Sequence, residues 1–437
     1  MPRKGYFIIG TLGILLLMAA ATLGIPDLRE RAAWHLSDWR GRIQYALFPP
    51  EEAVFVPQAQ VDAIVHATLQ AMTPSPSPTP TEPAPTIEPG ETASTSEPTA
   101  TPTPTPTPLP SSVSLEGVVY HDQHGMWNYC APANLAMGLS YWGWQGDRVT
   151  VGEVIKPFEK DKNVMLYEMA DYVTRYTNLT AAVRHGGDLQ TLKTLLANGY
   201  PVLVETGPMM KDVYGKISWI GHYTVLTGYD DAKGQFISQD SFYQPDYPIP
   251  YEQFEQEWRS FNYQFMVIFP YPQESEVMAL LGPLADPIAA FETAAERASR
   301  EIAELEGLGQ FFAWFNRGTS LVNLGDFTGA AAAYDQAFLL MAELPSSQRP
   351  WRILWYQTGP YFAYYFSGRY QDVIDLADTT ISAVAEPYIE ESFVWRARAK
   401  IVLGDYTGAA EDTRKALEYH PGFDPALELA TQLGIGG

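Results

Sequence analysis

The only cysteine among the 437 residues, Cys130, lies in a stretch that could make it a nucleophile. The sequence predicts a helix after Asn128, with Asn128 as the N-cap and Pro132 in the first turn. The free N–H groups of a helix N-terminus favour an anion, and the thiolate is the reactive form of cysteine. Upstream, Gln123 offers a side-chain N–H donor of the kind that an oxyanion needs during acyl transfer. On this stretch alone, a small buried structural cysteine remains the alternative.

A histidine and an aspartate further along the chain supply the other groups that a thiol nucleophile requires. His222 opens a predicted strand over residues 222–229 (HYTVLTGY), and Asp240 follows a return strand predicted over residues 235–239. A hairpin of these strands brings the two side chains to one edge of the sheet. The imidazole then takes the proton of Cys130, and the carboxylate holds the imidazole in place. We therefore predict a catalytic set of Cys130, His222 and Asp240, with Gln123 as the oxyanion donor.

The elements that position these residues predict an α+β domain over residues 113–273. Two further helices are expected at residues 165–176 and 188–198, the second with Asp188 as cap and Gly199 as stop. Strands are expected at 180–184, 201–205 and 265–270, in addition to the hairpin. Helices come first and an antiparallel sheet follows.

This arrangement resembles the papain-like cysteine peptidases of the bacteriocin-processing (double-glycine leader peptidase) type, in particular their stand-alone peptidase-like subgroup. The resemblance covers residues 115–270 and is carried by Gln123 before WNYCAPANLAM, by GHYTVLTGYDD and by SQDSF. It implies that Cys130 is the nucleophile, His222 the base, Asp240 the third member and Gln123 the oxyanion glutamine.

The sequence departs from the family pattern in three ways, of which the third bears on the substrate. The family often has Gly where Ala131 stands and Asp-Pro where Asp240-Ser241 stands, and neither change removes a catalytic group. Its best-known members are fused to a transporter that presents a leader peptide, and this sequence contains none. Two alternatives therefore stay open on the same fold: a catalytically silent peptide-binding module, and a Cys-His hydrolase that acts on peptidoglycan cross-links.

No cofactor or metal is expected. His121 and His124 have an H-x-x-H spacing, but no third zinc ligand accompanies them. The net charge of -23 argues against a nucleic-acid partner.

The N-terminal part predicts a membrane protein with its folded part outside the cytoplasm. Residues 1–26 contain an apolar run long enough to span a bilayer, either as an anchor or as a cleaved signal segment, in which case the protein is secreted. Residues 27–72 form a juxtamembrane helical region. Residues 73–110 are a Pro/Thr/Ser-rich linker that could extend roughly 100 Å at ~3.1 Å per residue. Basic residues just after the apolar run favour the opposite orientation by the positive-inside tendency, and the linker decides against it.

Residues 284–437 predict a solenoid of helix pairs. The segments LGDFTGAA and LGDYTGAA repeat around Gly325 and Gly404, and a weaker copy is centred on Gly368. The pattern is similar to the tetratricopeptide repeat, which implies a groove for a protein or peptide partner; a scaffold without a partner is the alternative. The abrupt change in composition after Gln273 further predicts that this part folds on its own.

Overall fold

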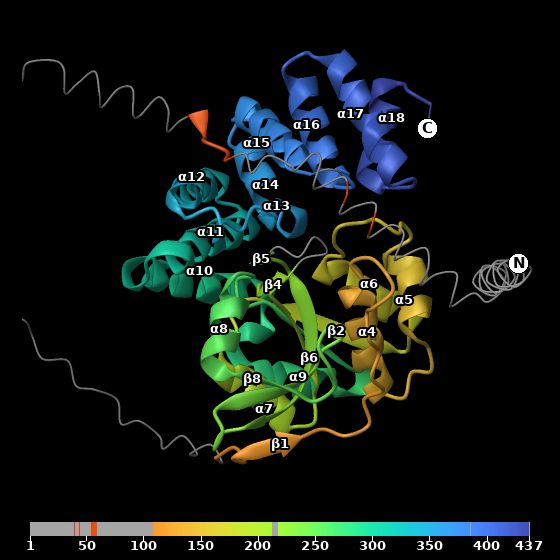
Figure 1. The fold of residues 1–437 in the computed structure, drawn as a ribbon, viewed down its shortest axis with the longest axis vertical. Helices are drawn as coiled ribbons and strands as arrows, with labels where there is room; N and C mark the ends of the chain where they lie inside the picture. The colour runs from red at the N-terminus through yellow and green to blue at the C-terminus, as the bar shows by residue number, and fades with distance from the viewer. Residues whose placement is uncertain are drawn as a thin grey trace, which may run out of the picture.

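The computed structural model describes residues 54–58, 108–211, 217–384 and 386–436, together with Trp39 and Ile43. The predicted membrane segment (1–26) lies outside the described residues, as does almost all of the juxtamembrane region (27–72) and of the linker (73–110). The described chain forms an α/β domain (residues 112–281) followed by a helical region (residues 287–433) (Figure 1).

The α/β domain is built on a seven-stranded antiparallel sheet in the order β2-β9-β3-β6-β7-β8, with β1 paired to β6. A separate two-stranded ribbon, β4-β5, lies outside this sheet. The strands are β1 (Ser112–Ser114), β2 (Leu179–Arg184), β3 (Val202–Thr206), β4 (Met209–Lys211), β5 (Ile217–Trp219), β6 (His222–Asp230), β7 (Gln235–Gln239), β8 (Tyr247–Pro250) and β9 (Phe265–Pro270).

Helices cover both faces of the sheet because the central strands are apolar on both sides. Successive side chains of a strand point to opposite faces. Accordingly, Leu203 and Val225 pack in one cluster with the helices α4 (Cys130–Tyr141), α5 (Arg148–Ile155) and α6 (Leu166–Tyr176). Their neighbours Val204 and Leu226 pack in another with α7 (Leu189–Ala197), α8 (Tyr251–Arg259) and α9 (Glu274–Leu281). The result is a three-layer domain in which β6 is central and α4 crosses it.

The helical region begins after two short 3-10 turns, η1 (Tyr271–Gln273) and η2 (Gly282–Ala285), which flank α9. The turn between α11 and α12 contains Gly325, with φ of 82°, and the turn between α16 and α17 contains Gly404, with φ of 85°. Asp326 and Asp405 cap the helices that follow. Both copies of the repeated sequence therefore lie at the turn of a helix pair. The helices are α10 (Pro287–Glu304), α11 (Gly307–Asn323), α12 (Phe327–Glu343), α13 (Ile353–Tyr356), α14 (Gly359–Phe366), α15 (Tyr370–Ser382), α16 (Glu390–Val402), α17 (Tyr406–Tyr419) and α18 (Asp424–Leu433).

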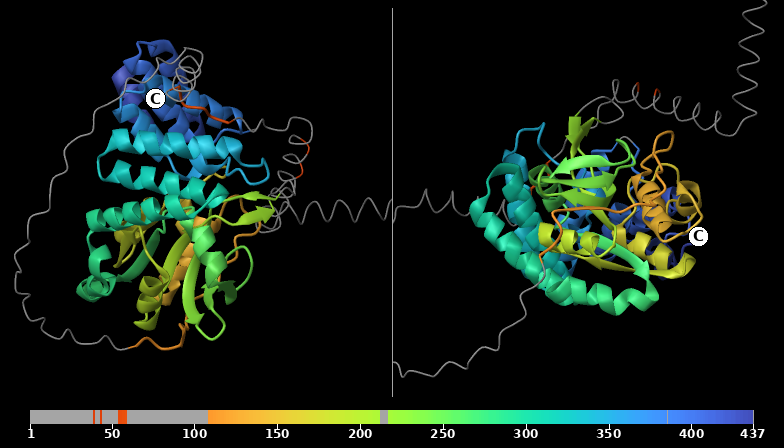
Figure 2. Two further views of the ribbon diagram at one scale, coloured as in Figure 1. Left: turned by 90° about the vertical axis from the view of Figure 1, so that its left-hand side faces the viewer. Right: turned by 90° about the horizontal axis from the view of Figure 1, so that it is seen from below.

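The helical region covers one end of the α/β domain (Figure 2), and a common hydrophobic cluster joins the two parts. Trp219 of β5 lies 5.9 Å from Phe312 of α11 and 5.5 Å from Tyr356 of α13, measured between ring centroids. Asn262 donates a hydrogen bond to Ser320 across the boundary at 3.0 Å. The prediction that the helical part folds on its own is opposed by this cluster, because separation would expose large aromatic side chains to water.

A short segment before the linker, residues 54–58, packs on the helical region. Phe55 is buried, with its ring centroid 5.1 Å from that of Phe338 in α12 and 5.9 Å from that of Tyr364 in α14. The backbone N–H of Gln58 donates to the carboxylate of Asp372 in α15 at 2.8 Å.

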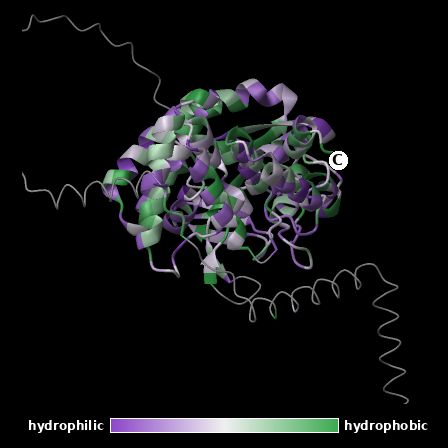
Figure 3. Ribbon diagram, turned by 90° about the horizontal axis from the view of Figure 1, so that it is seen from above, coloured by the Kyte–Doolittle hydropathy of each residue, from purple (hydrophilic) through white to green (hydrophobic). Residues whose placement is uncertain are grey.

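Viewed from above the helices, apolar and polar positions mix along them (Figure 3), as expected for amphipathic helices that pack on one side.

Among the described residues, one helical run, Tyr271–Glu304, is long and apolar enough to cross a membrane by length and composition alone. Val277, Leu281 and Ala290 of this run are buried in the α/β core, so the run is part of the folded body.

Candidate active site

Cys130 is the first residue of helix α4. The predicted N-cap is wrong: the cap position is Tyr129, without a side-chain hydrogen bond, and Asn128 has a positive φ of 47°. Asn128 instead donates to the carbonyl of Asp161 at 2.7 Å, so a contact with a distant loop overrides the local capping preference. The backbone N–H groups of Cys130 and Ala131 have no acceptor within α4, whereas Pro132 has no N–H and the N–H of Ala133 donates to the carbonyl of Tyr129 at 3.2 Å.

His222 and Asp240 meet at one end of the β6-β7 hairpin, as the sequence predicted. The register pairs Val225 with Gln239, which leaves His222 and Asp240 just beyond the paired residues. Nε2 of His222 lies 3.0 Å from Oδ1 of Asp240, and both side chains are buried. This contact leaves Nδ1 of the imidazole for the thiol of Cys130, which lines the same pocket as His222.

The charge of His222 is set by its two partners. Burial lowers the pKa of the imidazole, but the charge and hydrogen bond of Asp240, followed by those of Cys130, raise the pKa to about 10. Burial raises the pKa of Asp240, but His222 and the backbone N–H groups of Tyr243 and Phe242 outweigh this effect and lower it. At neutral pH the pair is therefore an imidazolium and a carboxylate.

Gln123 is oriented by a chain of hydrogen bonds that starts in helix α4. Nδ2 of Asn134 lies 2.8 Å from Oγ of Ser241, and this hydroxyl donates to Oε1 of Gln123 at 2.8 Å. The backbone N–H of Gln123 also donates to the carbonyl of Ser241 at 2.9 Å. Since its oxygen is occupied by a donor, the side-chain N–H groups of Gln123 are left for the pocket.

Asn134 also connects the elements that carry the other site residues. It lies 2.9 Å from the carbonyl oxygen of Cys130 and 2.8 Å from that of Tyr223, the residue after His222. Asn134 and Ser241 are fully buried, so this polar network is closed to water. Neither residue was predicted from the sequence, although an Asn one helical turn after Cys130, on an otherwise apolar face, was a readable signal.

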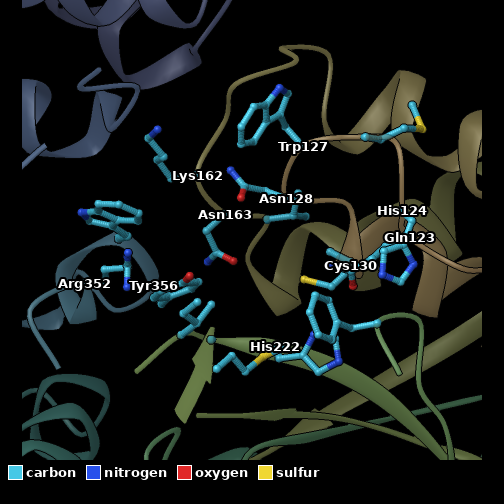
Figure 4. A pocket seen from close by; sticks show the side chains of 18 of the residues that line it. Gln123, His124, Trp127, Asn128, Cys130, Lys162, Asn163, His222, Arg352 and Tyr356 are labelled. Carbon is cyan, nitrogen blue, oxygen red and sulfur yellow. The ribbon is translucent and has the colours of Figure 1, made fainter. Parts of the chain in front are cut away.

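The three groups Gln123, Cys130 and His222 line one pocket with a volume of about 230 Å³ (Figure 4). Asp240 lies behind His222 and does not line it. The far wall comes from the helical region, through Arg352, Trp355 and Tyr356, so the pocket lies between the two parts of the chain.

A buried acidic residue lies next to the site. Glu205 of β3 is 2% exposed and receives a hydrogen bond from Gln264. Burial, together with the nearby Cys130, raises the pKa of Glu205 well above its usual range. The shift favours the neutral form of this carboxyl and so weakens its competition with Asp240 for the charge of His222.

His121 and His124, whose spacing was considered for zinc, belong to no cluster of candidate ligands in the described part of the chain. Within the described ranges, no group of three or more His, Cys, Asp or Glu side chains could hold a metal ion. His124 is exposed and packs against the ring of Phe242 at 5.4 Å.

Comparison with known proteins identifies the α/β domain. Residues 115–266 match the family described as "Peptidase_C39 like family". No curated protein matches the chain. A C39-like peptidase from Bacillus anthracis is 20% identical over 36% of this chain and 96% of its own, with a TM-score of 0.30. A double glycine motif protease from the AMS/PCAT transporter, solved in complex with the leader peptide, is 17% identical over 36% of this chain and 94% of its own, with a TM-score of 0.27. By the family match, the chain contains a C39-like peptidase domain with a mixed α/β core, followed by a helical region.

Proposed function

We propose that the protein is a cysteine peptidase in which Cys130, His222 and Asp240 form the triad and Gln123 is the oxyanion donor. The observation that carries this proposal is the placement of His222, which is bonded to Asp240 at 3.0 Å and lines one pocket together with Cys130 and Gln123. The family match over residues 115–266 supports the same chemistry.

The residues act in two stages. Sγ of Cys130 attacks the carbonyl carbon of a peptide bond, and the oxygen becomes an oxyanion that accepts from Gln123 and from the free N–H groups of α4. His222 gives a proton to the departing amine, and the C–N bond breaks to leave a thioester. His222 then takes a proton from water, which attacks the thioester, and Cys130 is released with the carboxylic acid product. Asp240 keeps the imidazole oriented throughout.

We also propose a membrane anchor at the N-terminal end of the chain and a binding role for the helical region at the other end. The apolar run within residues 1–26 anchors the protein, with the folded part outside the cytoplasm, and the helix pairs act as tetratricopeptide-type repeats that bind a protein or peptide. The sequence supports both statements, through the hydrophobic run and through the LGD[FY]TGAA repeats. Because Cys130 is the single thiol, labelling of intact cells with a membrane-impermeant maleimide reports its side of the membrane.

Activity and thiol reactivity together test the peptidase proposal. The wild type should hydrolyse a library of fluorogenic peptides, Cys130→Ala should be inactive, and Gln123→Ala should lose about 10²- to 10³-fold in kcat. His222→Ala should slow alkylation of Cys130 by iodoacetamide at pH 7, whereas Gln123→Ala should leave alkylation unchanged. A thiol that reacts only after denaturation would refute the proposal and favour a binding module.

A further inference from the structure

The wall of the catalytic pocket is positively charged, although the chain as a whole carries a net charge of -23. The described residues that line the pocket include Lys162, Lys211 and Arg352, and they include no Asp or Glu. A cleft of one sign attracts ligands of the opposite sign. In an acidic protein, such a cleft is a local feature that the overall composition does not produce.

Lys162 has a charge that the fold does not balance directly. None of the described residues forms an ion pair with it, and the nearby Glu386 is bonded to Lys160 at 2.9 Å. Nζ of Lys162 lies 5.5 Å from the centroid of the Trp355 ring and 5.8 Å from that of Tyr388. Burial lowers the pKa of Lys162 to about 8, with Glu386 opposing the shift, so the ammonium form dominates at neutral pH. A half-buried cation of this kind gains when an anion binds.

Lys162 and Arg352 lie at the end of the pocket away from the oxyanion side. Figure 4 shows Lys162 and Arg352 across the pocket from Gln123 and His124. Lys162 belongs to the loop between α5 and α6, whereas Arg352 precedes α13 in the helical region. Arg352 is held in place by Ser218 and stacks on the ring of Trp351, with 4.0 Å from Cζ to the centroid. A peptide attacked by Cys130 that extends along the pocket would pass both cations.

We propose that the substrate of this site is an acidic peptide, whose carboxylate binds at the end of the pocket formed by Lys162 and Arg352. The inference rests on the proposed peptidase function, since it assigns the substrate class of the same pocket. Lys162 determines this specificity: its ammonium group recognises the carboxylate, and the aromatic rings of Trp355 and Tyr388 position the side chain. The carboxylate is that of an Asp or Glu side chain or that of a peptide C-terminus.

Binding to the inactive Cys130→Ala protein tests the proposal without requiring turnover. The probes are fluorescent Ala/Gly octapeptides, acetylated and amidated, with a single Glu at each position in turn, and the same set with Gln or Lys. At one or more positions Glu should bind about tenfold or more tightly than Gln, as expected for a charge-assisted hydrogen bond. A Gln peptide with a free C-terminus distinguishes a terminal carboxylate from a side chain.

The variants then assign the effect to Lys162. Adding Lys162→Gln should remove the preference for Glu, Lys162→Arg should keep most of it, and the matched surface control Lys233→Gln should leave it intact, because Lys233 is exposed and pairs with Asp230. Equal binding of Glu and Gln peptides, or a preference that survives Lys162→Gln, would overturn the proposal. Cleavage by the wild type is measured separately, so failure of the peptidase proposal can be told apart from failure of the substrate assignment.

Discussion

The substitution Ser241→Ala separates the orientation of the oxyanion donor from the reactivity of the thiol. Oγ of Ser241 donates to Gln123 and lies 2.8 Å from the donor of Asn134, so the substitution removes the contact that decides which atom of the Gln123 amide faces the pocket. A net hydrogen bond is worth about 0.5–1.5 kcal/mol. At 1.36 kcal/mol for each factor of ten, kcat/KM should fall about 2- to 13-fold, far less than the effect of Gln123→Ala.

The stability cost should be small, about 1 kcal/mol, because Asn134 keeps the carbonyls of Cys130 and Tyr223 as acceptors. Ser238→Ala is the matched control: Ser238 is also fully buried, but it donates to the carbonyl of Tyr247, away from the pocket. The assays are steady-state hydrolysis, iodoacetamide labelling and urea unfolding. Equal kinetic losses in the two variants would contradict the argument, and slower labelling of Cys130 in Ser241→Ala would show that the whole site has moved.

Two further perturbations test the buried groups around the site. Glu205→Gln should stabilise the fold progressively as the pH rises above the usual range for Glu, because the raised pKa of Glu205 means that ionisation of the wild-type carboxyl opposes folding. Tm measured from pH 4 to pH 8 should show a growing difference between the variant and the wild type. A difference that is constant with pH would refute this expectation. Trp219→Ala should lower the free energy of unfolding by about 3–5 kcal/mol. It should also convert a single unfolding transition into two, because Trp219 packs against aromatic rings of both parts of the chain. Circular dichroism and near-UV absorbance followed together would detect the two transitions.

The parts of the site that follow from local patterns could be predicted from the sequence. Residues 222–229 read as a buried strand, and the next turn and strand placed Asp240 beside His222, because the length of a hairpin fixes which residues share an edge. The strands 235–239 and 265–270 were predicted with the bounds that the structure has. The first turn of α4 was predicted from Pro132 and the apolar spacing that follows it.

What could not be predicted depends on contacts between distant parts of the chain. Asn128 has a favourable cap side chain, yet its partner is Asp161, and no local pattern indicates that contact. Likewise, nothing near Arg352 or Tyr356 indicates that they line the pocket of Cys130, because they reach it only through the packing of the helical region on the α/β domain. The β4-β5 ribbon, which carries Trp219 into that packing, is too short for its pattern to be distinctive.

The docked segment 54–58 changes what the linker does mechanically. The chain is fixed to the folded body twice: at Gln58, which bonds to α15, and again at residues 110–114, where Tyr229 binds the carbonyl of Pro110 and β1 joins the sheet. These two attachment points lie at opposite ends of the body (Figure 1). The sequence between them therefore connects two points that are both fixed on the folded body.

Under the proposed membrane anchoring, the distance between the anchor and the folded body is set by the chain before Val54 and not by this connection. It acts instead as an intramolecular tether that raises the effective concentration of the docking segment at the helices α12, α14 and α15. Proteolysis within this connection would turn this contact into a weak bimolecular one and release the body. Under the proposed anchoring, the chain from the anchor reaches the folded body at the face formed by α12, α14 and α15.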